Sequence, residues 1–449
     1  MAETLEAIAE QLLAAAKRAG ADAADVMVAE GDSLSVAVRL GEIETLKRAR
    51  AKHLGLRVFA GQSTAISATA DFSRETLANF AAETCALARV TAPDPFGGLP
   101  ASTELAREIP DLDLYDPEAE SVTPEYGIEL ARTAESAARG ADPRITNSEG
   151  AEFGTGHDRV VYASTAGFMG SYRDSGFSLS VTPIASDRGA MQRDYWYTAT
   201  RRLRKLEDAE AVGRKAAART VRRLGARQVK TCEVPVVFDP EMAGSLLRHL
   251  AAAVSGYALY KGSSFLIDKL GERIGPDWLT VYDDGRVSGA LGSSPFDGEG
   301  VATRRTVVVD RGVLAGYLFD TYSARKLNGR TTGNATRSVG DAPHVSTTNM
   351  FPLAGTASPA EIIGSVKNGL YVTELIGMGV NGVTGDYSRG AVGQWIVDGE
   401  LAYPVEEITI AGNLLEMFRN IELIGSDLEL RHSVSAPTIK IARMTVAGL

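Results

Sequence analysis

The chain has 449 residues, which is long enough for two domains with ample hydrophobic cores. Its 44% hydrophobic and 23% charged content is ordinary for a globular protein, and its net charge of −10 argues against a general nucleic-acid binder, because phosphate contacts need a cationic surface. Two cysteines, Cys85 and Cys232, are too few for a disulfide framework and lack the spacing of a metal or redox motif.

The start of the chain and its hydropathy favour a cytoplasmic location. The first residues lack the basic start and apolar run of a signal peptide. No segment of about 18 consecutive apolar residues occurs, so no membrane span is expected. We therefore expect neither a membrane nor a nucleic acid among the partners of this protein.

The first third of the chain predicts two helices around a meander of strands. An apolar stripe at helical spacing predicts a helix over residues 3–19, which Gly20 ends. Short segments punctuated by glycines, several with a period of two, predict antiparallel strands over Asp25–Ala29, Ser33–Arg39, Glu42–Arg50, His53–Phe59 and Ser63–Thr69. A helix from about Ser73 to Val90 follows, and the proline-rich stretch 91–117 is predicted to be irregular.

A second set of helix and strands follows in the same order. A helix is predicted over residues 124–139, and strands over Ile145–Phe153, Arg159–Ser164, Phe168–Pro183 and Ala190–Thr200. The residues 187–189, Asp-Arg-Gly, predict a hairpin turn. The repeated order suggests a weak structural duplication. We therefore predict an α+β N-terminal domain, residues 1–228, of antiparallel strands flanked by helices.

Residues 201–230 form the most basic stretch of an acidic protein. They contain eleven Lys and Arg residues against three Asp and Glu residues, in a helix-like pattern. One interpretation is the solvated outer face of a helix that connects two domains. The other is a docking surface for an acidic partner or for the carboxylates of a peptide.

Residues 239–256 predict the helix around which the second half is organised. Asp239 is a suitable N-cap, and Pro240 is favourable at the first helical position. Gly256 can adopt the left-handed conformation that ends a helix. An apolar stripe at helical spacing predicts that one face packs inward; it consists of Met242, Leu246, Leu247, Leu250 and Val254.

The run from Pro235 to Leu266 resembles the TldD/PmbA family, which occurs as two related subunits. In the metal-binding subunit, two leucines at this point are followed by His-Glu-x-x-x-His. Aligning these leucines with Leu246 and Leu247 of this chain places Arg248 at the first His, His249 at the Glu and Ala253 at the second His.

Neither Arg248 nor Ala253 can ligate a metal, because a guanidinium does not lose its proton and a methyl group has no lone pair. The resemblance also implies a third ligand, a C-terminal Cys. Residues 433–437, Ser-Val-Ser-Ala-Pro, occupy that region, and no Cys follows Cys232. The chain therefore resembles the subunit without metal, called PmbA or TldE.

The rest of the second half, residues 229–449, is rich in glycine and in strand patterns. We predict a short helix at Ile267–Gly271, a hairpin around residues 310–312 and a long loop over 328–358. Residues 377–382 match the dinucleotide pattern GxGxxG but lead into a hairpin and not a helix, so no nucleotide cofactor is expected. Together with the resemblance, these patterns predict a strand-rich C-terminal domain with a mixed, barrel-like sheet.

The segment most specific to the family is Gly385, Asp386, Tyr387, Ser388, Arg389 and Gly390. We predict that it forms a loop before a strand at Val392–Val397. Such a loop could bind an extended peptide by strand addition, with Arg389 holding a carbonyl or carboxylate group. Alternatively, Arg389 pairs with Asp386 and locks the turn.

The resemblance implies a complex of two related subunits that cleaves small or unfolded peptides in a closed chamber. This chain is then a subunit without catalytic residues or cofactors of its own, and zinc is expected in the TldD-like partner of a heterodimer. Residues Gly385–Gly390 would hold the peptide substrate. The alternative is a stand-alone, homodimeric peptide- or protein-binding regulator, as the family's other name, modulator of DNA gyrase, suggests.

Overall fold

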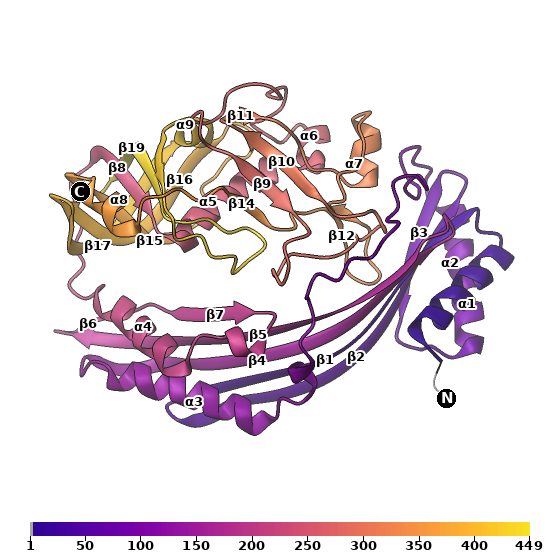
Figure 1. Ribbon diagram of the computed structural model, residues 1–449, viewed down its shortest axis with the longest axis horizontal. Coiled ribbons are helices and arrows are strands. Elements are labelled where there is room, and N and C mark those ends of the chain that lie inside the picture. Colours follow the sequence, from indigo (N-terminus) through magenta and orange to yellow (C-terminus); the bar gives the residue numbers. More distant parts are fainter. Residues whose placement is uncertain (1–2) are drawn as a thin grey trace.

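The computed structural model describes residues 3–449 as two strand-rich halves that meet along one seam (Figure 1). Met1 and Ala2, at the start of the segment without signal-peptide features, lie outside the described residues. Within residues 3–449, no helix has the length and apolar character needed to cross a membrane.

A curved, seven-stranded antiparallel sheet forms the N-terminal half. Its strands are β1 (Ala23–Arg39), β2 (Glu42–Ala60), β3 (Ser63–Thr69), β4 (Ile145–Ser164), β5 (Met169–Asp187), β6 (Ala190–Arg193) and β7 (Trp196–Thr200). Their order is β3-β2-β1-β4-β5-β6, and β7 also pairs with β5. The two sets of strands therefore meet through their first members, β1 and β4, which pair along residues 25–38 of β1.

Helices cover the convex face of this sheet and leave its concave face toward the C-terminal half (Figure 1). They are α1 (Leu5–Arg18), α2 (Arg74–Val90), α3 (Pro124–Gly140) and α4 (Ala209–Val221), with the 3₁₀ turns η1 (Pro117–Glu120) and η2 (Leu203–Lys205). The apolar stripes of α1 and α2 pack on β1 and β2, and those of α3 and α4 pack on β4 and β5. The predicted helices, the strand β3 and the turn at Arg188 and Gly189 are confirmed.

Several strands predicted as separate pieces are in fact continuous. Strand β1 runs through Gly31, where we expected a break, because this glycine serves a close approach and not a turn. A Cβ atom at Gly31 would lie 1.9 Å from a carboxylate oxygen of Asp158 on β4, so a side chain here would force Asp158 to move. The predicted pairs of strands in β2 and β4 are likewise single strands.

A closed barrel forms the centre of the C-terminal half. Its strands are β8 (Cys232–Phe238), β15 (Asn368–Ile376), β16 (Asp386–Val397), β17 (Glu400–Asn413) and β19 (Ile439–Ala447), and β18 (Ile421–Ile424) pairs with β19. Because β17 pairs with both β16 and β19, the order β17-β16-β15-β8-β19 closes on itself. Strands β8 and β15 are parallel and the other pairs antiparallel, which confirms the predicted mixed, barrel-like sheet.

A smaller sheet packs beside the barrel. It contains β9 (Val281–Asp284), β10 (Arg305–Asp310), β11 (Val313–Leu314) and β14 (Met350–Pro352), and a separate pair contains β12 (Ala335–Thr336) and β13 (His344–Val345). The helices of this half are α5 (Pro240–Ala253), α6 (Gly256–Tyr260), α7 (Thr321–Lys326), α8 (Pro359–Gly364) and α9 (Leu414–Arg419). The leucines of α5 fill the core between barrel and small sheet.

Two predictions about helices in this half are wrong. Helix α5 ends at Ala253, and Gly256 does not stop it but begins the next helix, α6. Glycine suits this position because a Cβ atom there would lie 2.5 Å from atoms of both Phe319 and Ser323. Residues 267–271 form turns in place of a helix, since Asp268 has a positive φ of 60° that interrupts helical geometry. The Asp239 cap of α5 and the Asn413 cap of α9 are confirmed.

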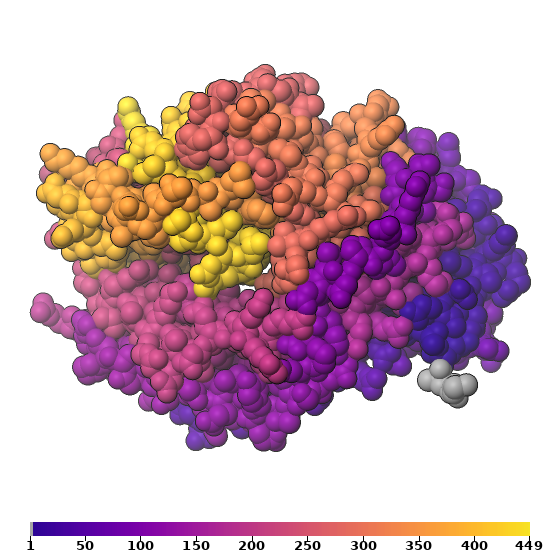
Figure 2. Space-filling view, viewed as in Figure 1, coloured from indigo at the N-terminus to yellow at the C-terminus, as the bar shows by residue number. Residues whose placement is uncertain are grey.

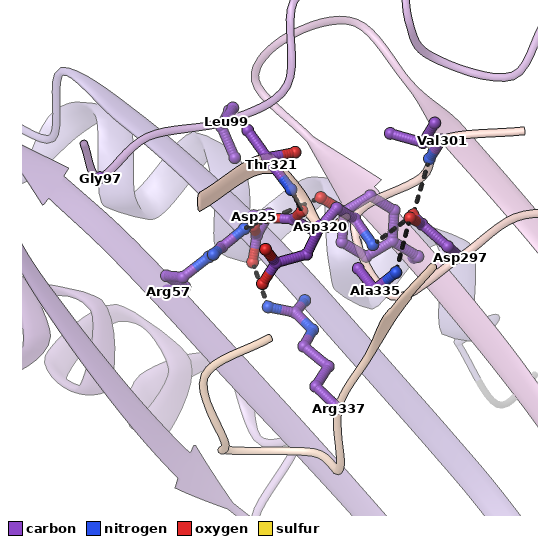
Figure 3. A network of polar contacts seen from close by, with 12 residues as sticks. Asp25, Arg57, Gly97, Leu99, Asp297, Val301, Asp320, Thr321, Ala335 and Arg337 are labelled. Carbon is purple, nitrogen blue, oxygen red and sulfur yellow. Dashed lines mark hydrogen bonds and ion pairs between the residues drawn. The ribbon is translucent and has the colours of Figure 1, made fainter. Parts of the chain in front are cut away.

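Buried charges join the two halves (Figure 3). Asp25 on β1 accepts from Arg57 Nε of β2 at 2.8 Å and from Arg337 Nη1 of the C-terminal half at 2.9 Å. Glu299, also in the C-terminal half, lies 3.3 Å from Arg57 Nη2. Burial opposes ionisation of Asp25, but Arg337 and Arg57 outweigh it and hold the pKa of Asp25 below its usual range. Charges that are almost fully shielded from water thus join the two halves at this point.

Candidate functional site

Helix α5 turns one side toward solvent beside the barrel. Arg248 and Ala252 are exposed on that side, and His249 is half-buried. Leu246, Leu247 and Leu250 point into the core because they follow the helical period of the apolar stripe. Ala253, at the position of the motif's second histidine, is also buried.

A cavity of about 720 Å³ opens beside this side of α5, and we call it the α5 cavity. Its walls come from α5, the segment 255–265, the loop 378–382, strand β16 and residues 433–434. They include Arg248, His249, Phe265, Met378, Val380, Arg389, Leu414 and Ser433. The positions of all three ligands that the family resemblance implies, two on α5 and one near residue 433, therefore adjoin one cavity.

The side chains at these positions do not fit a zinc ion. Around the α5 cavity, one imidazole is accompanied by two guanidinium groups and serine hydroxyls, whereas a zinc site needs three or more Cys, His, Asp or Glu ligands. Throughout residues 3–449, no group of three or more such side chains is arranged to hold a metal ion. The positive charges of Arg248 and Arg389 would also repel a divalent cation.

His249 has an unusual environment. Its ring packs edge-on against Tyr387 with 5.9 Å between the ring centres, and its Nε2 is buried without a hydrogen-bond partner. Burial lowers the pKa of His249, and the cations Arg389 and Arg248 lower it further. The Nε2 of His249 is therefore an unsatisfied polar atom beside the α5 cavity.

Residues 385–390 form the beginning of strand β16, and the predicted loop is wrong. Gly385 closes the preceding turn with a φ of 80°, and Tyr387 is buried. One edge of this strand pairs with β17. On the other edge, Ser388 N donates to the Gly379 carbonyl at 2.6 Å, and Asn381 N donates to the Asp386 carbonyl at 2.8 Å. The chain's own residues 379–381 thus occupy the edge that strand addition of a peptide would need.

Arg389 does not pair with Asp386, so the turn-locking alternative is also wrong. Its guanidinium donates to the carbonyl oxygens of Leu375 and Ile376 at 3.3 and 3.4 Å, and Asp386 accepts from the Thr384 hydroxyl at 2.6 Å. Among residues 385–390, Arg389 lines the α5 cavity. A role of this segment in binding peptide remains a prediction, now centred on Arg389.

Sequence reasoning missed a second cavity, of about 440 Å³, between the two halves. We call it the seam cavity. Helix α4 contributes Lys215 and Arg219, and Arg222 follows at its C-cap. The interpretation as a solvated outer face is therefore wrong for Arg219 and Arg222, which are not exposed, and holds for Arg214 and Lys215, which are. The spacing of the three residues that line the cavity, four and then three apart, places them on one helical face and could have indicated their shared position. Arg248 and Val434 line both cavities, which therefore adjoin.

Comparison with known proteins places these features in a family. Models of the PmbA/TldA metallopeptidases match residues 24–88 (domain 1), 117–224 (central domain) and 231–448 (C-terminal domain). The chain is 39% identical to metalloprotease PmbA of Escherichia coli O157:H7, over 95% of this chain and 92% of that protein. It is 26% identical to a metalloprotease TldD homologue of Haemophilus influenzae, over 73% of each.

Solved structures share the whole fold. A candidate modulator of DNA gyrase from Bacteroides thetaiotaomicron superimposes with a TM-score of 0.93 at 29% identity, covering 99% of this chain and all (100%) of that one. TldE from Thermococcus kodakarensis superimposes with a TM-score of 0.89 at 22% identity, covering 98% and 100%, which shows a common fold.

Proposed function

Because this chain belongs to the TldD/PmbA family of metallopeptidases, we propose that it takes part in peptide hydrolysis as a subunit without a metal site of its own. It forms a heterodimer with a TldD-like subunit that binds zinc. The substrates are small or unfolded peptides, enclosed in a chamber that the two subunits build together.

The observation that carries this proposal is the side-chain chemistry of α5. The helix presents an exposed Arg248 at the position of the first ligand, and Ala253, at the position of the second, is buried and has only a methyl group. A metal-bound water needs several donor atoms to hold its metal, and this helix offers one imidazole. The hydrolytic water must then be activated on the partner subunit.

The contribution of this chain is the wall of the chamber. The α5 cavity combines apolar side chains, among them Phe265, Met378 and Leu414, with the two cations Arg248 and Arg389. Such a surface accepts apolar peptide side chains and offers donors to peptide carbonyl or carboxylate groups. It can therefore hold a peptide in position without acting on the scissile bond.

The experiment compares hydrolysis of an unstructured peptide by this chain, by a TldD-like subunit from the same genome and by their mixture, with zinc added. We expect no hydrolysis by this chain, and a rate for the mixture well above that of the TldD-like subunit alone. Full activity of the TldD-like subunit alone would reject the chamber role. Zinc-dependent hydrolysis by this chain alone would reject the non-catalytic assignment.

The same samples separate the alternative function. Size-exclusion chromatography of the mixture should yield one species that contains both chains. A stable homodimer of this chain that does not associate with the TldD-like subunit would instead favour a stand-alone peptide- or protein-binding regulator.

A further inference from the structure

The seam cavity lies where the C-terminal half descends onto the N-terminal sheet; in Figure 2 the yellow C-terminal segment rests against the pink part of the N-terminal half. Helix α4, strand β7, the start of α5 and the segment 427–436 supply its walls. Its charged lining consists of Lys215, Arg219, Arg222, Asp239, Glu241, Arg248, Asp427, Glu429 and Arg431.

Every carboxylate in this lining already has a partner. Asp239 accepts from Met242 N at 2.9 Å and lies 3.4 Å from Arg219. Glu241 accepts from the Tyr197 hydroxyl at 2.7 Å. Asp427 accepts from the backbone and hydroxyl of Thr438, and Glu429 pairs with Arg431. Each of these acids is thus hydrogen-bonded or ion-paired within the protein, and no such contact joins any of them to Arg222 among the described residues.

Three of the cations have no such partner within residues 3–449. The Arg222 guanidinium makes no hydrogen bond or ion pair, and its Nε and Nη2 atoms are buried. The Lys215 ammonium lies 3.5 Å from the centre of the Trp196 ring and forms no ion pair. Arg248 also lacks an ionic partner, and both Lys215 and Arg248 are exposed residues.

Arg222 is the most informative of the three, because it is half-buried and its Nε and Nη2 are fully buried. Burial lowers its pKa, and the neighbouring Arg219 lowers the pKa further, because both disfavour the charged form. Asp194 and Asp239 oppose this shift from a distance, but neither bonds Arg222. A largely buried cation without a hydrogen bond or ion pair is costly, and proteins normally give it one. A guanidinium kept in this condition on the wall of a cavity is suited to receive an anion from outside.

We propose that the seam cavity binds the α-carboxylate at the C-terminal end of a peptide, with Arg222 as its main partner and Lys215 as a second cation. A guanidinium recognises a carboxylate by its positive charge and by directed N–H donors. Four carboxylates in the lining disfavour a more highly charged anion such as phosphate.

The position of the cavity supports a peptide as the bearer of this carboxylate. Trp196, Tyr371 and Val434 provide apolar wall beside Arg222. Because the seam and α5 cavities adjoin at Arg248 and Val434, a peptide held by its end at Arg222 would extend past Arg248 into the α5 cavity. The choice of a peptide rests on the proposed function, whereas the carboxylate site rests on the geometry alone.

The test measures binding of fluorescein-labelled five-residue peptides to the full chain by fluorescence anisotropy. One peptide has a free C-terminal carboxylate, the second a C-terminal amide, and the third an amide with aspartate as its last residue. We expect the free acid to bind at least ten times more tightly than the plain amide. Arg222→Gln should reduce the affinity for the free acid to that for the amide and leave the affinity for the amide unchanged.

Matched variants make the result specific. Arg214→Gln removes an exposed arginine of α4 that pairs with Glu210, and it should change no affinity. Lys215→Met should weaken binding of the free acid by a smaller factor than Arg222→Gln. Thermal melting of each variant confirms folding, and a correctly folded Lys215→Met tests the site even if Arg222→Gln fails to fold.

Equal affinities for free acid and amide would overturn the proposal, as would an Arg222→Gln variant that still prefers the free acid. Tight binding of the aspartate amide but not of the free acid would assign the site to acidic side chains and reject the α-carboxylate. These outcomes do not depend on hydrolysis. An inactive mixture with carboxylate binding intact would reject the proposed function and keep the site.

Discussion

Arg337 of the C-terminal half donates from Nη1 to Oδ1 of Asp25 in the N-terminal sheet, over 2.9 Å, and both side chains are almost fully buried. Asp25 also bonds Arg57, so one carboxylate on β1 connects two strands of the sheet with the other half of the molecule (Figure 3). Water cannot compensate these charges if one partner is removed.

Replacing Arg337 with Met should therefore destabilise the protein by about 3–5 kcal/mol, because it leaves a buried, partly uncompensated carboxylate. Urea unfolding monitored by circular dichroism measures the change. Arg48→Met, which breaks the exposed Arg48–Asp32 pair on the same sheet, is the control and should cost less than about 1 kcal/mol. Equal effects of the two substitutions would contradict a special role of the buried pair.

Gly256→Ala should destabilise the C-terminal half by about 1–3 kcal/mol through overpacking. Its new methyl group would lie 2.5 Å from atoms of Phe319 and Ser323, at the start of α6. Gly364→Ala is the matched control, since a Cβ there meets no atom within 4 Å and that residue lies in α8. The thermal midpoint should fall for the first variant and stay constant or rise for the second.

Asp239 should make stability depend on pH. Burial raises the pKa of this carboxyl to about 6, and Arg219 and Arg222 of α4 oppose that shift only partly, while Glu241 of α5 adds to it. The stability that Asp239 contributes is then fully present below its unfolded pKa of 3.8 and is lost as pH rises through about 6.

Asp239→Asn isolates this contribution because asparagine also caps a helix. The unfolding free energy of the wild type relative to this variant should fall by up to about 1.4 kcal/mol per pH unit between pH 4 and 6 and then level off. Measurements from pH 4 to pH 8 test it. Parallel curves for the two proteins would show that the pKa of Asp239 is not raised.

Arg222→Met should stabilise the protein, by about 1–2 kcal/mol, because it removes a buried cation that has no partner. Arg214→Met on the exposed part of the same helix should change stability by less than about 0.5 kcal/mol. Chemical unfolding of both variants gives the two values. A loss of stability for Arg222→Met would mean that its guanidinium is compensated in the folded protein.

A chelator should separate the fold of this chain from the activity of the complex. Since the described residues offer no set of metal ligands, EDTA should leave the thermal midpoint of this chain unchanged. The same treatment should abolish hydrolysis by its mixture with a TldD-like subunit, and added zinc should restore it. A lower midpoint in EDTA would reveal a metal that stabilises this chain.

Local chemistry predicted most elements well. Helical stripes, the Asp239 and Asn413 caps and the turn at Arg188 and Gly189 all depend on neighbouring residues, which a sequence displays directly. Glycines were misread where their role is tertiary. Gly31 accommodates Asp158 from another strand and Gly256 accommodates α7, and neither contact can be read from the surrounding residues.

The site was predicted in part for the same reason. Arg248, His249 and Ala253 could be placed on one helix from the sequence because they belong to a single helical segment. The environment of Arg389 could not be predicted from the sequence, because its hydrogen-bond partners are carbonyl groups of the separate strand β15. The seam cavity needs both halves in place, so a basic stretch on α4 could not be assigned to it from composition.

The arrangement of the N-terminal sheet has a consequence for biosynthesis. Its central pairing joins β1 to β4, so that Val38 and Ala151, for example, become neighbours. The segments that form β2, β3, α2 and α3 lie between β1 and β4 in the sequence and are synthesised before β4. While the ribosome is still making those segments, one edge of the long strand β1 has no partner, and such an edge can pair with other chains. We therefore expect the nascent polypeptide to depend on chaperones during that interval.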